Sequence, residues 1–257
     1  MRKSLIFLLK FTAAIGIVAG LIWTAYGAEV SPRNFVLGIP TIIEYLYDMM
    51  PPSTSILSRI GNPLLETFQI ALVAIIASSI IGIPSSFLAA RNLSPNILIY
   101  QSMRTILGTL RGIPPLLYAV FLVAMVGLGP FAGVMALTLH VIGALGRYCS
   151  EAIENINPEI IDAAKSAGAN KLKIITYIVI PELRVLFLGY ILYYFESNIR
   201  NATTLGLVGA GGIGLLLIIN IHLFKYHEVC TIMLIIIALI IIMDRLSFMA
   251  RQKLIKG

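Results

Sequence analysis

The chain has 257 residues, of which 58% are hydrophobic and only 12% are charged. A soluble globular domain is about a quarter charged, so the composition excludes an ordinary soluble protein and indicates an integral membrane protein. The formal net charge of +7 indicates basic loops that orient the chain across a membrane, and we expect no nucleic-acid partner.

The first apolar block runs from Leu5 to Tyr26, directly after Arg2 and Lys3. Ala25-Tyr26-Gly27 has the small-x-small pattern of a cleavage site, so a signal peptide is one interpretation. The block is also long enough to cross about 30 Å of hydrocarbon at about 1.5 Å per residue. We therefore favour an uncleaved membrane anchor.

The segment from Glu29 to Pro63 is polar and rich in proline and serine, apart from Ile39 to Met50. From Ile39 to Met50 apolar residues recur at helical spacing, which predicts a helix lying in the membrane interface. A docking surface for an external partner is the alternative interpretation. We expect residues 1–63 to form an N-terminal anchor with a periplasmic or interfacial segment. Residues 64–257 would form the core transmembrane domain.

Five further apolar segments predict membrane-spanning helices. They run from Leu64 to Ala90, Pro115 to about Gly127, Phe131 to about Tyr148, Glu182 to about Leu205, and Val229 to Met249. With the anchor, they give an all-α integral membrane fold of about six spans.

Two connections between these spans have a character of their own. Asn96 to Arg111 predicts an amphipathic helix that places Arg104 and Arg111 on one face. The segment from Gly206 to His227 is rich in glycine and partly apolar, and we expect it to be a connection between two spans. No internal duplication is visible in the sequence.

Basic residues divide unevenly between the two sides of the membrane. With the N-terminus inside, the outside segments hold only Arg33, Arg59 and Lys225. The inside segments hold Arg2, Lys3, Arg91, Arg147, Lys165, Lys171, Lys173, Arg251, Lys253 and Lys256. This asymmetry follows the positive-inside rule and predicts that both termini and the loop from Glu151 to Pro181 are cytoplasmic.

The loop from Glu151 to Pro181 has the features of folded structure. Asn157-Pro158 predicts an N-cap followed by proline at the first helical position. Glu159 and Asp162 then lie in the first turns, where carboxylates favour the positive end of the helix dipole. Gly168 predicts a left-handed cap that ends this helix, and Asn170 predicts the start of another that runs to Pro181.

One side of the first of these helices is nearly flat, because its side chains are those of Ala163, Ala164 and Ala167. The surface of another protein could approach the helix backbone closely there. A solvated linker would need neither caps nor such a surface.

The residues of this loop resemble the coupling loop of bacterial ABC-importer permeases. The resemblance lies in Asp162-Ala163-Ala164, Gly168, Ile178, Ile180 and Pro181, with Asp in place of the usual Glu. Four other segments resemble the phosphonate-type branch of these permeases: AARNL (Ala89 to Leu93), RGIPP (Arg111 to Pro115), GLGPFAGVMAL (Gly127 to Leu137) and ATTLGLVGAGGIG (Ala202 to Gly214). The resemblance covers roughly Pro51 to Arg251.

The resemblance implies a type I ABC-importer permease bundle in the bacterial inner membrane, with a cytoplasmic coupling helix. It implies a second copy of the chain, two cytoplasmic ATPase subunits that bind ATP and Mg, and a periplasmic or lipid-anchored solute-binding protein. The implied solute is a phosphonate or a close analogue such as phosphite or a phosphate ester. The implied coupling residues are Glu159, Asp162, Ala163, Ala164, Gly168 and Pro181.

Gly209 to Gly214 matches G-x-G-x-x-G, but it follows a membrane helix and no βαβ unit surrounds it, so we exclude a dinucleotide fingerprint. A flexible membrane turn is the plain interpretation. The resemblance implies instead a non-helical segment that forms part of the translocation path, with Gly209, Gly211 and Gly212.

Glu196 and Arg200 lie four residues apart in a predicted span, in the favourable order for a helical ion pair. Charges at this depth are costly in lipid, so the pair either braces the bundle interior or belongs to the path. In the second interpretation Arg200 lines a polar route for a small anion, together with Asn198, Asn201, Thr203 and Thr204.

No enzymatic constellation stands out. The three histidines, His140, His222 and His227, show no metal-ligand spacing. The chain contains no P-loop and no catalytic triad or carboxylate pair, so we expect no catalysis and no cofactor in this chain. Cys149 and Cys230 are too few for a disulfide framework, and we expect two unpaired thiols.

Two other functions stay open. A permease of the same architecture could carry another solute, such as methionine or a different oxyanion. A non-transporting membrane protein, for instance an embedded enzyme or an assembly factor, would have no ATPase at the cytoplasmic loop.

Overall fold

The computed structural model describes residues 2–28 and 31–256, and the chain forms two compact units that divide between Met50 and Pro51. The first unit holds α1 (Arg2–Gly27) and α2 (Pro32–Asp48). Lys10–Gly27 of α1 is apolar enough to cross a membrane. Helix α2 contains the predicted amphipathic segment, whereas Glu29 lies outside the described residues.

The second unit consists of helices only, as far as the described residues extend. They are α3 (Leu57–Ala89), α4 (Ile97–Gly112), α5 (Pro115–Val126), α6 (Pro130–Glu154), α7 (Pro158–Ser166), α8 (Lys171–Ile174), the π-helical turn η1 (Ile175–Val179), α9 (Ile180–Gly206), α10 (Gly212–His222) and α11 (Tyr226–Lys256). The all-α prediction is therefore confirmed.

Five helices are long and apolar enough to cross a membrane: α1, α3, α6, the continuous α8–α9 segment and α11. Helices α4 and α5 pass the same test as a pair, but they are bent by 85° at their junction. Counting that pair gives the expected six spans. Helix α5 alone has 12 residues and reaches only about 18 Å, so the expectation of a separate span there was wrong.

Two other boundaries differ from the sequence-based expectation. Helix α3 begins at Leu57 and continues through Pro63, whose carbonyl accepts a hydrogen bond from the Thr67 hydroxyl at 2.9 Å. The expected division after residue 63 therefore falls inside a helix. The connection after Gly206 is also more ordered than predicted, because most of it forms α10.

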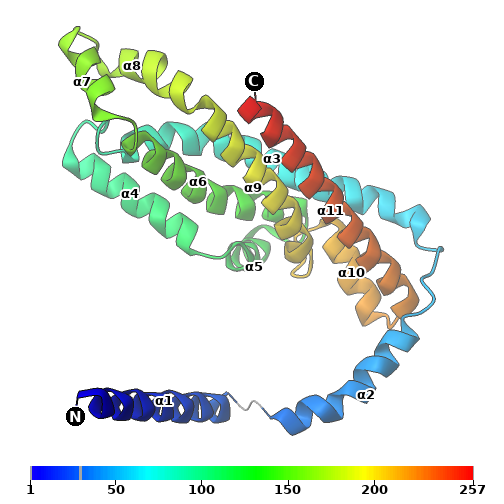
Figure 1. Cartoon of the computed structure of the whole chain (residues 1–257). Coiled ribbons are helices and arrows are strands. Elements are labelled where there is room, and N and C mark those ends of the chain that lie inside the picture. The colour runs from blue at the N-terminus through cyan, green and yellow to red at the C-terminus, as the bar shows by residue number, and fades with distance from the viewer. Residues whose placement is uncertain (1, 29–30, 257) are drawn as a thin grey trace. The chain divides into compact units, whose positions relative to one another are not determined.

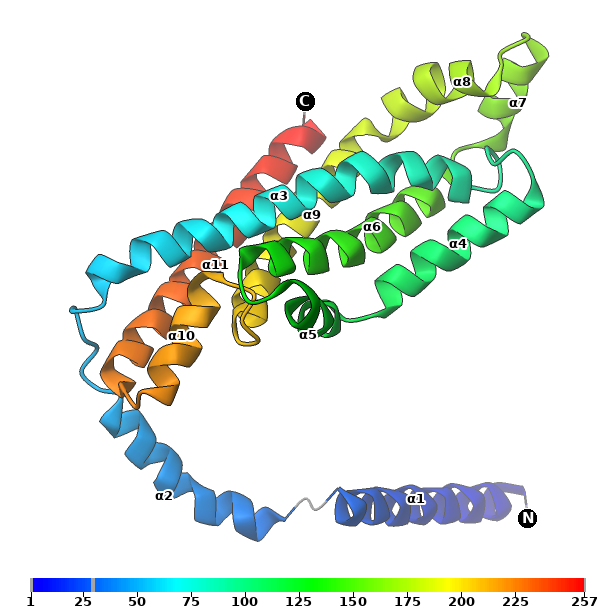
Figure 2. The same ribbon diagram turned by 180° about the vertical axis from the view of Figure 1, so that it is seen from behind.

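Helix α6 lies at the centre of the second unit, with α3, α4, α5 and α9 around it (Figures 1 and 2). Helices α7 and α8 lie at one end of this bundle and α10 lies at the other. Helix α11 packs against α9 and α10.

Glycines let α6 approach its neighbours closely, as is usual for membrane helices. The backbone of Arg111 and the carbonyl of Leu107 lie directly against Gly143, and the Leu107 side chain lies against Gly146. Gly82 of α3 in turn lies against the backbone of Ile142. These contacts fix the separation of α6 from both α4 and α3.

The break between α4 and α5 follows from the RGIPP segment, because Pro114 and Pro115 have no N–H to continue the helix. The carbonyls that this break releases have other partners. The Tyr118 hydroxyl donates to the Leu110 carbonyl at 3.1 Å, and His140 Nδ1 lies at hydrogen-bond distance, 3.1 Å, from the Ile113 carbonyl. His140 therefore supports the broken helix.

The close approach at Gly143 gives a test of this packing. Gly143→Ala would place a methyl group against the backbone of α4, and we expect it to lower the free energy of unfolding by about 1–3 kcal/mol. Gly108→Ala is the matched control, because a Cβ at Gly108 would meet no atom within 4 Å. Thermal unfolding of the detergent-solubilised protein measures both, and equal midpoints for the two variants would contradict the packing described here.

Candidate functional site

Helix α7 has the caps that the sequence predicts. The Asn157 side chain accepts from the Glu159 backbone N–H at 3.0 Å, and Pro158 occupies the first helical position. At the other end Gly168 has φ +81°, with Gly168 N–H donating to Lys165 O and Ala169 N–H to Ala164 O. This pair of hydrogen bonds is the Schellman motif, so the helix ends at a fixed place and angle.

One side chain anchors α7 to the bundle. Ile161 is 3% exposed and packs in a cluster with Ile153, Ile174 and Leu183, among others. The opposite side of α7 is free, because Glu159, Asp162 and Ala163 are exposed. Ala164 is half-buried against the same cluster, so the three alanines do not share one exposed face as expected.

The base of this loop is braced by Glu154 at the end of α6. The Glu154 carboxylate accepts from the Arg91 backbone N–H at 2.8 Å and forms an ion pair with Arg104 at 2.9 Å. The Asn92 amide donates to the Ile153 carbonyl at 2.8 Å. The AARNL segment therefore ties the end of α3 to the end of α6.

A second contact reaches the far side of the loop, where Lys171 Nζ donates to the Ser94 carbonyl at 2.9 Å. Asn170 caps α8 as predicted, with its side chain accepting from Lys173 N–H. The helix does not end at Pro181, which corrects the expectation. Pro181 has no N–H, and the chain passes through the π-helical turn η1, where Ile180 N–H donates to Ile175 O, and continues as α9.

Glu196 of α9 is the carboxylate on which two arginines converge. Its side chain is 9% exposed and pairs with Arg200 at 3.0 Å, as predicted, and with Arg251 of α11 at 3.2 Å. Arg200 is 54% exposed, whereas Arg251 is 30% exposed. One negative charge is thus shared by two positive charges, and it joins α11 to α9.

The other predicted path residues of α9 do not gather in one place. Thr204 is exposed like Arg200, one turn away, and its hydroxyl donates to the Asn201 carbonyl. Thr203 is buried and donates to Ile199 O, and Asn198 is fully buried. Neither polar atom of the Asn198 amide has a hydrogen-bond partner among the described residues.

The glycine-rich turn after α9 is non-helical, as predicted. Gly209, Gly211 and Gly212 have φ values of +88°, +83° and +73°. All three are buried: Gly209 lies against Leu128, Gly211 against Glu66 and Pro130, and Gly212 against Thr67. The Thr67 hydroxyl accepts from Ile213 N–H at 2.8 Å, so a side chain of α3 satisfies the first turn of α10.

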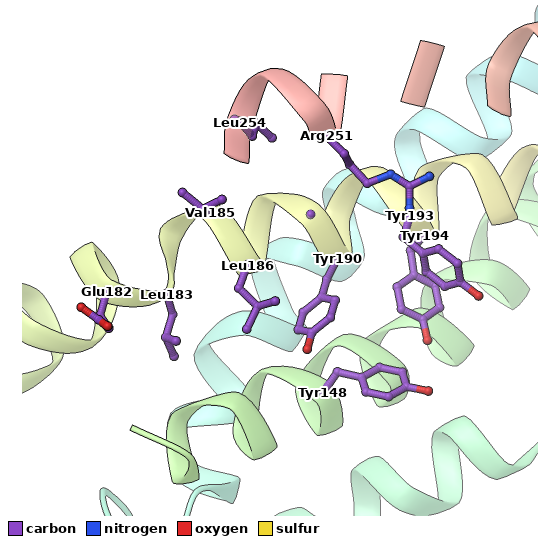
Figure 3. Close-up of a pocket in the computed structure, with 11 residues that line it drawn as sticks. Tyr148, Glu182, Leu183, Val185, Leu186, Tyr190, Tyr193, Tyr194, Arg251 and Leu254 are labelled. Carbon is purple, nitrogen blue, oxygen red and sulfur yellow. The ribbon is translucent and has the colours of Figure 1, made fainter. Parts of the chain in front are cut away.

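A cavity of about 650 Å³ opens between α6, α9 and α11 (Figure 3). Arg251 points from α11 toward Tyr193 and Tyr194 of α9, and Tyr148 forms the α6 wall. The rings of Tyr148 and Tyr190 are 5.8 Å apart and those of Tyr193 and Tyr194 are 5.2 Å apart. Most other lining residues are aliphatic, and Glu182 lies at the end toward the loop.

Sequence reasoning missed both Arg251 and this cavity. Arg251 was counted among the basic residues that orient the chain, because its partner lies 55 positions away. The tyrosines at positions 190, 193 and 194 do form a pattern at helical spacing, which could have indicated an aromatic face on α9. The two cysteines are unpaired, as predicted.

Comparison with known proteins adds to this geometry. The profile of the family described as "Binding-protein-dependent transport system inner membrane component" matches residues 82–255. The putative phosphite transport system permease protein HtxC of Stutzerimonas stutzeri is 34% identical over 237 residues, which are 92% of this chain and 84% of that protein. The phosphite transport system permease protein PtxC of the same organism is 32% identical over 240 residues, with 93% and 87% covered.

Among solved structures, the chain is similar to one of the MetNI methionine ABC transporter in inward-facing conformations. The TM-score is 0.67 at 19% sequence identity, and the match covers 79% of this chain and 99% of that one. At this level of identity the likeness shows the fold alone.

Because two arginines share the Glu196 carboxylate, we expect the neutral substitutions of Glu196 and Arg200 to lower the free energy of unfolding by unequal amounts. Glu196→Gln leaves two arginines without their partner, and we expect it to lower the free energy of unfolding by on the order of 3 kcal/mol. Arg200→Gln leaves Glu196 paired with Arg251 and should cost about 1 kcal/mol or less. Glu182→Gln, an exposed carboxylate of the same helix, is the control in a thermal-unfolding series. Equal losses for the first two variants would contradict a shared carboxylate.

Proposed function

The chain belongs to the family of binding-protein-dependent transport system inner membrane components, and we propose that it is the permease subunit of an ATP-driven importer for a small phosphorus-containing anion. A phosphonate, or a close analogue such as phosphite, is the proposed solute. The observation that carries the proposal is the likeness to two phosphite permeases over more than nine-tenths of the chain. The fold is that of a type I ABC-importer permease.

The proposed complex contains two copies of this chain and two cytoplasmic ATPase subunits that bind ATP and Mg. A periplasmic or lipid-anchored binding protein delivers the solute from the other side. In this arrangement both termini are cytoplasmic, which is supported by the excess of Lys and Arg in the segments that would lie inside.

Helix α7 is the proposed docking element for the ATPase. Support comes from its exposed residues Glu159, Asp162 and Ala163, and from the fixed cap at Gly168. Ile161 packs α7 into a cluster with residues of α6, α8 and α9. Glu154 before α7 and Lys171 after it both bind the connection between α3 and α4, at Arg91 and Ser94. When ATP closes the ATPase dimer, movement of α7 would therefore be passed to the bundle as a rigid body, and the path would switch from inward-facing to outward-facing.

The proposed path follows α9. Arg200 and Thr204 contribute its exposed polar groups, Glu196 balances the arginines, and Asn198 and Thr203 face the bundle beside it. Gly209, Gly211 and Gly212 close its end at α10 by tight packing against α3 and the turn before α6. The cavity beside Tyr148 and Arg251 would form its cytoplasmic vestibule.

Reconstitution tests the function directly. The chain is co-expressed with its ATPase and binding protein, purified, and placed in proteoliposomes that contain ATP. We expect uptake of phosphite or an alkylphosphonate and no uptake of methionine or sulfate. Uptake of methionine alone would overturn the proposed solute, and failure of an ATPase subunit to co-purify would overturn the transport function.

The cap at Gly168 gives a test of docking. A Cβ there would meet no atom within 4 Å, so the cost of Gly168→Val arises from its φ of +81° and from bulk on the exposed surface. We expect the variant to insert normally but to lose at least about 90% of ATPase activity stimulated by the loaded binding protein. Gly108→Val is the control for an added side chain in open space. Normal stimulation in Gly168→Val would remove α7 from the ATPase interface.

A further inference from the structure

Arg111, at the end of α4, lies beside the midpoint of α6. Its backbone nitrogen packs against Gly143, which is 13 residues from the start of α6 and 11 from its end. Because α6 is one of the helices long enough to cross a membrane, Arg111 lies close to half-depth. The adjacent break between α4 and α5 is also the kind of discontinuity that marks solute sites in membrane transporters.

The charge of Arg111 is not balanced. It is exposed, and it forms no ion pair with any described residue of the chain. The neighbouring arginines differ, since Arg104 pairs with Glu154, Arg147 pairs with Glu151, and Arg200 and Arg251 share Glu196. Glu196, the carboxylate deepest in α9, is therefore already occupied.

An aromatic ring holds the guanidinium in place. Arg111 Cζ lies 4.6 Å from the centroid of the Tyr148 ring, which is within the range of a cation–π contact. Tyr148 also lines the 650 Å³ cavity and faces Tyr190 and Tyr194, with ring centroids 5.8 Å and 6.2 Å away. The guanidinium is thus fixed beside the wall of the cavity while its N–H donors remain free of carboxylates.

An unpaired arginine at half-depth is unfavourable against lipid, so this face of α4 must meet a polar environment. The planar fork of a guanidinium matches two oxygens of a tetrahedral oxyanion. We infer that Arg111, supported by Tyr148, is the residue that binds the phosphorus oxyanion, on the α4 side of the tyrosines that line the cavity. The inference rests on the proposed function, and it assigns the solute contact to Arg111 because Arg200 and Arg251 are already paired.

The test compares Arg111→Gln with Arg111→Lys in proteoliposomes that hold the whole complex. Solute uptake and ATP hydrolysis are measured together, with radiolabelled phosphite and methylphosphonate as the probes. For Arg111→Gln we expect uptake to fall at least about tenfold while ATPase stimulation by the binding protein changes less than about twofold. Arg111→Lys keeps the charge and the fold but loses the fork, and its uptake per ATP should be intermediate.

Arg245→Gln is the matched control, because Arg245 is also an exposed arginine, in α11, with no ion pair among the described residues. We expect it to transport like the wild type. Unchanged uptake per ATP in Arg111→Gln would overturn the inference, as would a parallel loss of uptake and ATPase activity, which would give Arg111 a structural role. If the wild type itself takes up neither probe, the proposed solute fails and the inference fails with it.

Discussion

An apolar bilayer offers no water to a free backbone N–H or C=O, and this constraint decides where the helices of this chain can break. Both breaks inside the bundle meet it with side chains. At the junction of α4 and α5, Tyr118 and His140 bind the released carbonyls. At the glycine-rich turn, the Thr67 hydroxyl accepts a hydrogen bond from the N–H of Ile213, the second residue of α10. The break between α4 and α5 is therefore stable only while α4, α5 and α6 keep their positions. The glycine-rich turn likewise depends on the positions of α3 and α10.

The same low-polarity environment limits the charges. The described part of the bundle contains one deep carboxylate held by two arginines, which joins α9 to the C-terminal helix. The three groups carry one net positive charge, and Arg111 adds another from the opposite side of the tyrosine cluster. On the proposed path beside α9, an anion would meet this positive charge and the tyrosine hydroxyl groups, with Glu182 as the carboxylate among the cavity-lining residues. A positively charged solute would be disfavoured by the same arrangement.

Mechanical connection between the exposed loop and the bundle depends on few contacts. Ile161 is the buried side chain of α7, and Glu154 fastens the end of α6 to α3 and α4. Helix α9 follows α8 through a π-helical turn with no loop in between, and the capped turn at residues 167–170 joins α7 to α8.

The sequence alone determined the parts that depend on local pattern. Apolar runs gave the membrane helices, Asn157-Pro158 and Gly168 gave the caps of α7, and the spacing of Glu196 and Arg200 gave their ion pair, because each depends on residues within a few positions of one another. Only the tertiary structure decided the rest. The 85° bend after α4 and the passage of the helix through Pro181 depend on which groups receive the backbone bonds that proline leaves open. The pairing of Arg251 with Glu196 and the position of Arg111 over Tyr148 join residues far apart in the chain, and no sequence period carries that information.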